Sequence, residues 1–192
     1  MILLFGVPGT GKTALGAQLS RLLGRRLITV SWLVLWKGLW IGYDKDRRSF
    51  IIDEEGFRRA LRKLDEKTIV ETHWIEPFVD LADRVEALVV TRCDPRVLKK
   101  RLERRGWPRR KIAENVEAEL LGLVASEVQQ MARAAPEAAL IEVDTSSRSP
   151  RKAALSVLEA IRERRRSQCC IDWMALLGED AVFSMLSDIR RV

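Results

Sequence analysis

The stretch GVPGTGKT, residues 6–13, decides the fold class of this 192-residue chain. It matches the pattern G-x-x-x-x-G-K-[ST] in full. The short apolar run ILLF, residues 2–5, precedes it, and residues 14–23 follow with apolar side chains at helical spacing. A strand, a glycine-rich loop and a helix in this order predict a loop that binds phosphate groups.

The residue types of this loop fit ATP and Mg²⁺. Glycine at Gly9 and Gly11 permits backbone conformations that turn successive N–H groups toward phosphate oxygens, and the following helix points its positive end at them. We expect Lys12 to reach the β and γ phosphates and the Thr13 hydroxyl to bind Mg²⁺. A chance match in a glycine-rich turn is the alternative, and the strand and helix patterns on either side argue against it.

Composition places the chain among globular proteins. Hydrophobic residues make up 47% and charged residues 32%, and the length suits one domain with a small lid or tail. The cysteines, Cys93, Cys169 and Cys170, lack the spacing of a zinc site. Apolar runs are too short for a membrane span, so we expect a cytoplasmic protein without membrane contact. The net charge of +7 favours an anionic partner, which can be a nucleotide, RNA or an acidic protein surface.

The rest of the chain alternates strand and helix patterns. The strand candidates are residues 2–5, 27–30, 68–70, 87–91 and 140–143. The helix candidates are residues 54–64, 97–105, 150–165 and one long helix over 111–132. This alternation predicts a three-layer α/β sandwich with a five-stranded parallel sheet that helices cover on both faces.

Three tryptophans, Trp32, Trp36 and Trp40, recur at helical spacing after the second predicted strand. Such a stripe is more typical of packing in a core or lid than of base stacking. We therefore expect this stripe to pack, with Trp32 as the candidate for lining an acceptor pocket.

A basic cluster occupies residues 104–111 and is interrupted by Gly106 and Pro108. The break suits a mobile loop, and guanidinium groups match phosphoryl oxygens in shape and charge. Arg105, just before the break, is the leading candidate for contact with a transferring phosphoryl group. A solvated basic face is the alternative interpretation.

Several segments occur together in the order and spacing of one family. They are GVPGTGKT, GYD at residues 42–44, IDEE at 52–55, IVETHW at 69–74, and LERRGW at 102–107 with Lys111, Asn115 and Glu119 after it. Over residues 1–165 the chain resembles the atypical adenylate kinases and ATPases of archaea and eukaryotic nuclei, which take part in small-ribosomal-subunit assembly. The loop motif is common to many families, whereas the other segments are more particular to this one.

The resemblance implies a P-loop nucleotide-kinase-like domain over residues 1–165, with a nucleoside-monophosphate-binding region at about 30–53 and a short lid at about 104–114. Residues 166–192 form a C-terminal helical tail that we expect to pack on the domain or to bind a partner. The residues implied to bind ATP are Gly9, Thr10, Gly11, Lys12, Thr13, Ala14, Arg105 and Arg148. The implied catalytic residues are Lys12, Arg105, Glu71 and His73, and Mg²⁺ would be held by Thr13 and, through a water, by Glu71.

Two positions depart from the family pattern. Ala14 stands where a second hydroxyl residue is common, which removes one hydrogen bond of about 1 kcal/mol but leaves the backbone N–H. Glu71 stands where the family commonly has aspartate, so its carboxylate reaches one methylene farther. His73, the only histidine, follows two residues later and is expected to face the same side, near the attacking water or the lid. A hydrogen-bonded structural role is the alternative for His73.

These observations predict magnesium-dependent transfer of the ATP γ-phosphoryl group to AMP, with ATP hydrolysis as a second activity. The resemblance also implies a role in rRNA maturation, with a small-subunit ribosomal protein of the platform and nearby rRNA as partners. One alternative is an ATP-driven assembly switch with little kinase activity. Another is a small-molecule kinase whose acceptor is a nucleoside or shikimate, for which Arg47 and Arg48 offer cations.

Overall fold

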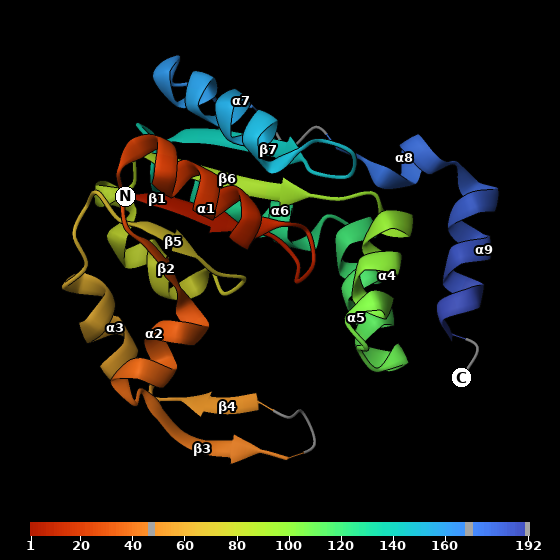
Figure 1. Ribbon diagram of the computed structural model, residues 1–192, viewed down its shortest axis with the longest axis horizontal. Helices are drawn as coiled ribbons and strands as arrows, with labels where there is room; N and C mark the ends of the chain where they lie inside the picture. The colour runs from red at the N-terminus through yellow and green to blue at the C-terminus, as the bar shows by residue number, and fades with distance from the viewer. Residues whose placement is uncertain (46–48, 168–170, 191–192) are drawn as a thin grey trace.

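A five-stranded parallel sheet forms the centre of the protein in a computed structural model that describes residues 1–45, 49–167 and 171–190 (Figure 1). Its strands are β1 (Ile2–Phe5), β2 (Leu27–Thr29), β5 (Ile69–Glu71), β6 (Ala87–Arg92) and β7 (Ala139–Asp144). They lie in the order β2-β5-β1-β6-β7, and every neighbouring pair is parallel. The predicted sheet is confirmed. Four residues named above, Arg47, Arg48, Cys169 and Cys170, lie outside the described residues.

Helices cover both faces of the sheet, which explains why its central strand β1 is apolar throughout (Figure 1). Successive residues of β1 point to opposite faces: Leu3 and Phe5 pack in one core cluster, and Ile2 and Leu4 pack in the other. The elements on the two faces are α1 (Lys12–Leu23) with α7 (Pro150–Arg162), and α3 (Glu54–Arg62) with the 3-10 helix η1 (Glu76–Arg84) and α6 (Leu123–Met131). The three-layer sandwich follows from this burial on both sides.

Helix starts coincide with the sequence signals, whereas one long helix was predicted wrongly. Asp94 accepts a hydrogen bond from Arg96 N at the start of α4 (Pro95–Arg104), and Ser149 caps α7 in the same way. The helix expected over residues 111–132 is instead two helices, α5 (Arg109–Leu120) and α6. Gly122 separates them with a φ of 63°, a left-handed conformation that ends one helix before the next begins.

The tryptophan-rich segment forms a helix and a hairpin rather than one packed stripe. α2 (Val30–Lys37) ends at Gly38, and the antiparallel strands β3 (Trp40–Asp44) and β4 (Ser49–Ile52) follow. Trp36 is 57% exposed and stacks on the exposed Trp32 at 4.9 Å between ring centroids, while Trp40 lies in β3. The predicted packing stripe is therefore wrong, because the left-handed Gly38 turns the chain before Trp40 can join the helix face.

The C-terminal helices α8 (Trp173–Leu177) and α9 (Glu179–Arg190) lie beside α4 and α5 (Figure 1). Trp173, Val182 and Met185 are buried in one cluster with apolar residues of α4 and α5. None of the helices in the described part of the chain has the length and apolar character that a bilayer crossing requires.

We predict that Val157→Ala lowers the free energy of unfolding by about 2 kcal/mol, because it removes two buried carbon atoms and leaves a cavity. Val157 lies on α7 and is fully buried against the sheet. The matched control is Leu155→Ala on the same helix, where the side chain is half exposed and the change should be small. Urea denaturation followed by circular dichroism measures both. Equal losses in the two variants would contradict this account of the core.

Candidate active site

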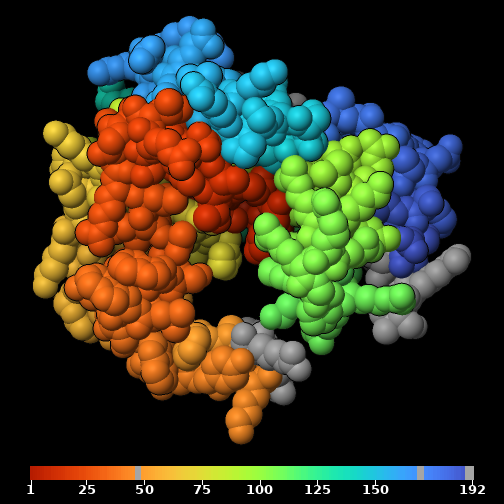
Figure 2. All heavy atoms as spheres, in the orientation of Figure 1, coloured from red at the N-terminus to blue at the C-terminus, as the bar shows by residue number. Residues whose placement is uncertain are grey.

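The carboxyl ends of the parallel strands meet at one edge of the sheet, and a pocket of about 970 Å³ opens there. Its walls come from the loop after β1, from α2 and β4, from residues 71–74 at and after the end of β5, and from Arg105 and Trp107 after α4. Figure 2 shows the molecule hollowed between the α2–β4 side and the α4–α5 side. The pocket therefore joins segments that are far apart in the sequence.

Glycine is required at two positions of the loop. Gly6 has a φ of 144°, and a Cβ there would lie 2.4 Å from Thr91 Oγ1. Gly9 has a φ of 96°, and its Cβ would lie 2.7 Å from Leu98 Cδ1 of α4. The loop backbone thus packs directly against β6 and α4, so the N–H groups that face the pocket remain available to a ligand.

Thr10, which was predicted to contact the nucleotide, lies beneath the loop. Its side chain is fully buried, donates to Val7 O at 2.8 Å and shares a hydrogen bond of 2.6 Å with Thr91 Oγ1. Thr145 Oγ1 donates to the carbonyl oxygen of Thr10. Thr10 therefore ties the loop to β6 and to the segment after β7, and its hydroxyl faces away from the pocket.

Lys12 is a buried cation at the base of the pocket, with 7% of its surface exposed. Its Nζ donates to Gly6 O at 2.8 Å and to Val7 O at 3.2 Å. Burial lowers the pKa of Lys12 to about 8, against an opposing effect of the Glu71 carboxylate. The hydrogen bonds of Lys12 within the described residues go to backbone carbonyls, and an incoming phosphate would supply an anionic partner.

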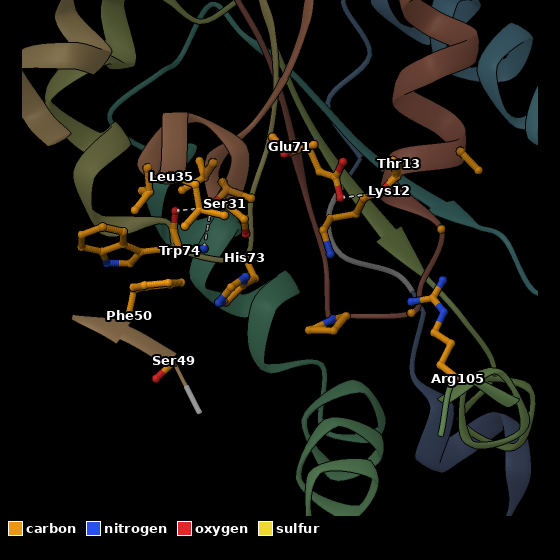
Figure 3. Close-up of a pocket in the computed structure, with 18 of the residues that line it drawn as sticks. Lys12, Thr13, Ser31, Leu35, Ser49, Phe50, Glu71, His73, Trp74 and Arg105 are labelled. Atoms are coloured by element: carbon orange, nitrogen blue, oxygen red, sulfur yellow. Dashed lines mark hydrogen bonds between the residues drawn. The ribbon is translucent and has the colours of Figure 1, made fainter. Parts of the chain in front are cut away.

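Thr13 and Glu71 face each other across the loop (Figure 3). Thr13 Oγ1 donates to Glu71 Oε1 at 2.8 Å. Glu71 Oε2 is buried and has no hydrogen-bond partner among the described residues. A carboxylate oxygen without a donor, beside a threonine hydroxyl, fits the oxygen ligands that Mg²⁺ prefers. Thr13 and Glu71 are thus the residues that would hold the ion.

His73 and Arg105 line the same pocket from two sides (Figure 3). His73 is exposed at the pocket, where partial desolvation, followed by the positive charge of Lys12, lowers the pKa of its imidazole and favours the neutral form. Arg105 is the residue at which α4 ends, before Gly106 at a φ of 67°. The predicted helix break therefore delivers the Arg105 side chain to the pocket.

Arg148 lies outside this pocket, in an adjoining one of about 440 Å³. Arg105 lines both pockets, and so do Gly9, Gly11 and Ala14 of the loop. The adjoining pocket also contains Arg101 and Arg104, with Leu15, Pro150 and Ala153 as apolar wall. The two spaces therefore meet at the loop and at Arg105.

The wall opposite the loop lies mostly within residues 30–53, the region expected to bind a nucleoside monophosphate, but its individual residues were not predicted from the sequence. It contains Ser31 and Leu35 of α2, Ser49 and Phe50 of β4, and Trp74 (Figure 3). Trp74 stacks on Phe57 with ring centroids 5.2 Å apart and an angle of 14° between the planes. Trp32, the expected candidate, does not line the pocket, because α2 turns Ser31 and Leu35 toward it and Trp32 and Trp36 toward solvent. The sequence signal for this arrangement was the four-residue spacing of Ser31 and Leu35, which places both on one face of a helix.

Comparisons with known proteins identify the family of this chain. The family model described as "AAA domain" matches residues 2–122. A protein of Saccharolobus solfataricus named "Putative adenylate kinase" is 36% identical, over 78% of this chain and 76% of its own length. One of the same name from Sulfurisphaera tokodaii is 31% identical, over 98% and 97%. The chain belongs to this adenylate-kinase-like family.

Solved structures show the same fold outside the adenylate-kinase-like family. A shikimate kinase from Acinetobacter baumannii aligns with a TM-score of 0.59 at 20% identity, over 86% of this chain and 94% of that one. A gluconokinase from Sinorhizobium meliloti aligns with a TM-score of 0.51 at 17% identity, over 84% and 91%. The adenylate-kinase-like chain therefore has the fold of P-loop kinases.

We predict that Lys12→Met makes the ligand-free protein more stable at pH 7, by about 2–3 kcal/mol. The pKa of Lys12 is about 8 in the folded protein, below its ordinary 10.5, so folding at pH 7 buries a charge that the unfolded chain keeps in water. As the pH rises from 8 to 10.5, the folded wild type loses this penalty and the difference between the two proteins should shrink.

Urea denaturation at pH 7 and pH 10 measures the effect, with the exposed Lys37→Met as control. A Lys12→Met protein that is less stable than wild type at pH 7 would refute the account of Lys12 as an uncompensated buried cation.

Proposed function

We propose that this protein is a magnesium-dependent adenylate kinase that transfers the γ-phosphoryl group of ATP to AMP and also hydrolyses ATP. The observation that carries the proposal is a single pocket with a phosphate-binding loop at one end and an aromatic and hydroxyl wall at the other. Lys12 and Arg105 line the space between these ends. A volume of about 970 Å³ is at the upper end of ligand pockets, which suits two substrates held together.

The donor half of the pocket is the loop with its adjoining pocket. ATP phosphates would bind N–H groups of residues 9–14 other than Thr10, whose N–H donates to Val7 O, and the ammonium group of Lys12. The adenine would enter the space between Arg104, Arg148 and Pro150, where guanidinium planes and an apolar wall can hold a flat ring. Residues 104–114 would close over it as the lid.

The acceptor half is the wall formed within residues 30–53 together with Trp74. Phe50 and Trp74 offer aromatic faces to a base, and Ser31 and Ser49 offer hydroxyl groups to its polar edge. This aromatic wall supports an acceptor that contains a base over shikimate, which has no flat base to stack on Phe50 or Trp74. A nucleoside remains the stronger of the alternative acceptors.

Catalysis in this proposal is positioning and charge neutralisation, without a covalent enzyme intermediate. An oxygen of the AMP phosphate attacks the γ-phosphorus as the bond from that phosphorus to the β,γ-bridging oxygen breaks, and ADP leaves. Lys12 and Arg105 would stabilise the charge on the transferring group. Mg²⁺, when held by Thr13 and Glu71, would neutralise phosphate charge. In hydrolysis a water attacks instead, and neutral His73 can accept its proton.

A role in small-ribosomal-subunit maturation also belongs to the proposal, because it rests on the family resemblance. A platform ribosomal protein and nearby rRNA would be the partners. Exposed large apolar side chains on α2, β3 and β4 support a macromolecular partner, since such side chains are common at interaction sites. They include Trp36, Trp40, Ile41 and Tyr43.

A product assay tests the reaction and its acceptor together. With ATP and Mg²⁺, we expect AMP to raise ADP formation above the rate from ATP hydrolysis alone, with two ADP made by transfer for each AMP consumed. Phosphate release that only the ribosomal partner stimulates would favour the assembly switch, and transfer to a nucleoside or shikimate but not to AMP would favour another small-molecule kinase. Lys12→Ala serves as control against a contaminating kinase.

We predict that His73→Ala lowers ATP hydrolysis by about 10²-fold, as expected for loss of a general base, while ATP affinity changes little. Transfer to AMP should fall far less, because the AMP phosphate has no proton to lose. His73→Asn, which keeps hydrogen-bonding groups but cannot accept the proton, should behave like the alanine variant. If both variants hydrolyse ATP at the parental rate, His73 has no part in the mechanism.

A further inference from the structure

A buried ion cluster lies behind the active site, at the carboxyl end of β6. Arg92 and Glu119 are each 2% exposed, and Arg92 Nε donates to Glu119 Oε1 at 2.8 Å. Arg92 also donates to Glu142 of β7 and to the carbonyl oxygen of Glu119. Because a buried charge without a partner is strongly destabilising, this cluster fixes the end of α5 against the sheet.

The C-terminal segment, residues 171–190, completes this cluster. Trp173 Nε1 donates to Glu119 Oε1 at 2.9 Å, and the indole ring is 6% exposed. Ile171 N donates to Glu142 Oε2 at 3.0 Å, and Ile171 O accepts from Arg92 Nη1 at 3.1 Å. The segment is therefore bound through polar groups of the core, as well as by its apolar residues.

The helices that hold Trp173 also support the phosphate-binding loop. Val7 of the loop, Leu98 and Leu102 of α4, and Trp173 belong to one buried cluster. Leu98 and Leu102 pack on Gly9, where a Cβ would lie 2.7 and 3.0 Å from their side chains. Arg101 of α4 donates to Thr145 O at 2.7 Å and to Gly9 O at 3.4 Å. A shift of α4 would thus displace the phosphate-binding loop.

Arg105 follows α4 directly, so its position depends on how α4 is held. On the far side from the loop, α4 is tied to the C-terminal segment by an ion pair between Lys99 and Asp188. The pocket residue Trp107 is packed against the same buried cluster as Trp173. The positions of Arg105 and Trp107 therefore depend on packing to which residues 171–190 contribute.

We propose that Trp173 is a positioning residue for phosphoryl transfer: through Glu119 and the packed helices α4 and α5, it sets Arg105 against the transferring phosphoryl group. The proposal rests on the function proposed above. It gives the C-terminal segment a role in the reaction, although Trp173 does not line the pocket. Misplacement of a catalytic group by about 1 Å can reduce a rate by about 10²-fold, so a small shift of α4 suffices.

The test is a double-mutant cycle between Trp173→Phe and Arg105→Ala. Trp173→Phe removes the N–H donor to Glu119 and keeps most of the buried ring. We expect it to lower the rate of transfer to AMP at least fivefold, with the KM for ATP within twofold. In the Arg105→Ala background the same change should alter the rate by less than twofold, because a residue that acts through Arg105 loses its effect when Arg105 is absent.

Val157→Ala is the matched control, since it weakens the core on α7, away from α4 and α5. Its rate should remain within twofold of wild type. A loss with Trp173→Phe that persists in the Arg105→Ala background, or that Val157→Ala reproduces, would overturn the proposal, and so would an unchanged rate.

Amide hydrogen exchange separates this proposal from the proposed reaction. Trp173→Phe should speed exchange in residues 104–112 of the ligand-free protein, whereas Val157→Ala should leave that segment unchanged. Unaltered exchange in Trp173→Phe would overturn the positioning role. Absence of transfer to AMP in the wild type, with the expected exchange pattern intact, would instead refute the proposed reaction alone.

Discussion

The buried hydrogen bonds of Thr10 with Thr91 and Thr145 hold the phosphate-binding loop in a shape that the rest of the site requires. The loop needs left-handed backbone at Gly6 and Gly9, and each glycine lies so close to its neighbour that a side chain would collide. Hydroxyl groups from the ends of β6 and β7 therefore fix the loop from below, and its N–H groups remain directed outward. The positions of Lys12 and Thr13 follow from that fixed backbone.

Two charged groups at the pocket, Lys12 and Glu71, have few neutralising partners among the described residues. Lys12 is held by backbone carbonyls rather than by a carboxylate, and Glu71 keeps one oxygen without a donor in the described structure. These groups destabilise the ligand-free fold, and a phosphate with its metal ion would satisfy them together. The Arg92–Glu119 cluster behaves differently, because its charges are satisfied within the protein. Lys12 and Glu71 are therefore suited to binding a ligand, whereas the Arg92–Glu119 cluster is suited to attaching helices to the sheet.

The two sets of charges lie at the same edge of the sheet, because parallel strands bring all their carboxyl ends together. β1 leads to the loop, β5 to Glu71 and His73, and β6 to Arg92. The segment that carries Arg105 lies between these sites, since α4 packs on the loop and on the C-terminal segment. A change in how α4 packs on the loop or on the C-terminal segment would therefore alter the position of Arg105 at the pocket.

The sequence by itself determined the parallel sheet, the loop with Lys12 and Thr13, the helix break after Arg105 and the place of Glu71 and His73 near the end of a strand. These features depend on local pattern: apolar runs, glycine and proline positions, and short fixed spacing. The tertiary structure alone decided which face of α2 lines the pocket, that Thr10 turns inward, and that Trp173 binds Glu119. These features depend on contacts between segments far apart in the chain, or on a choice between helix faces that only the packing makes.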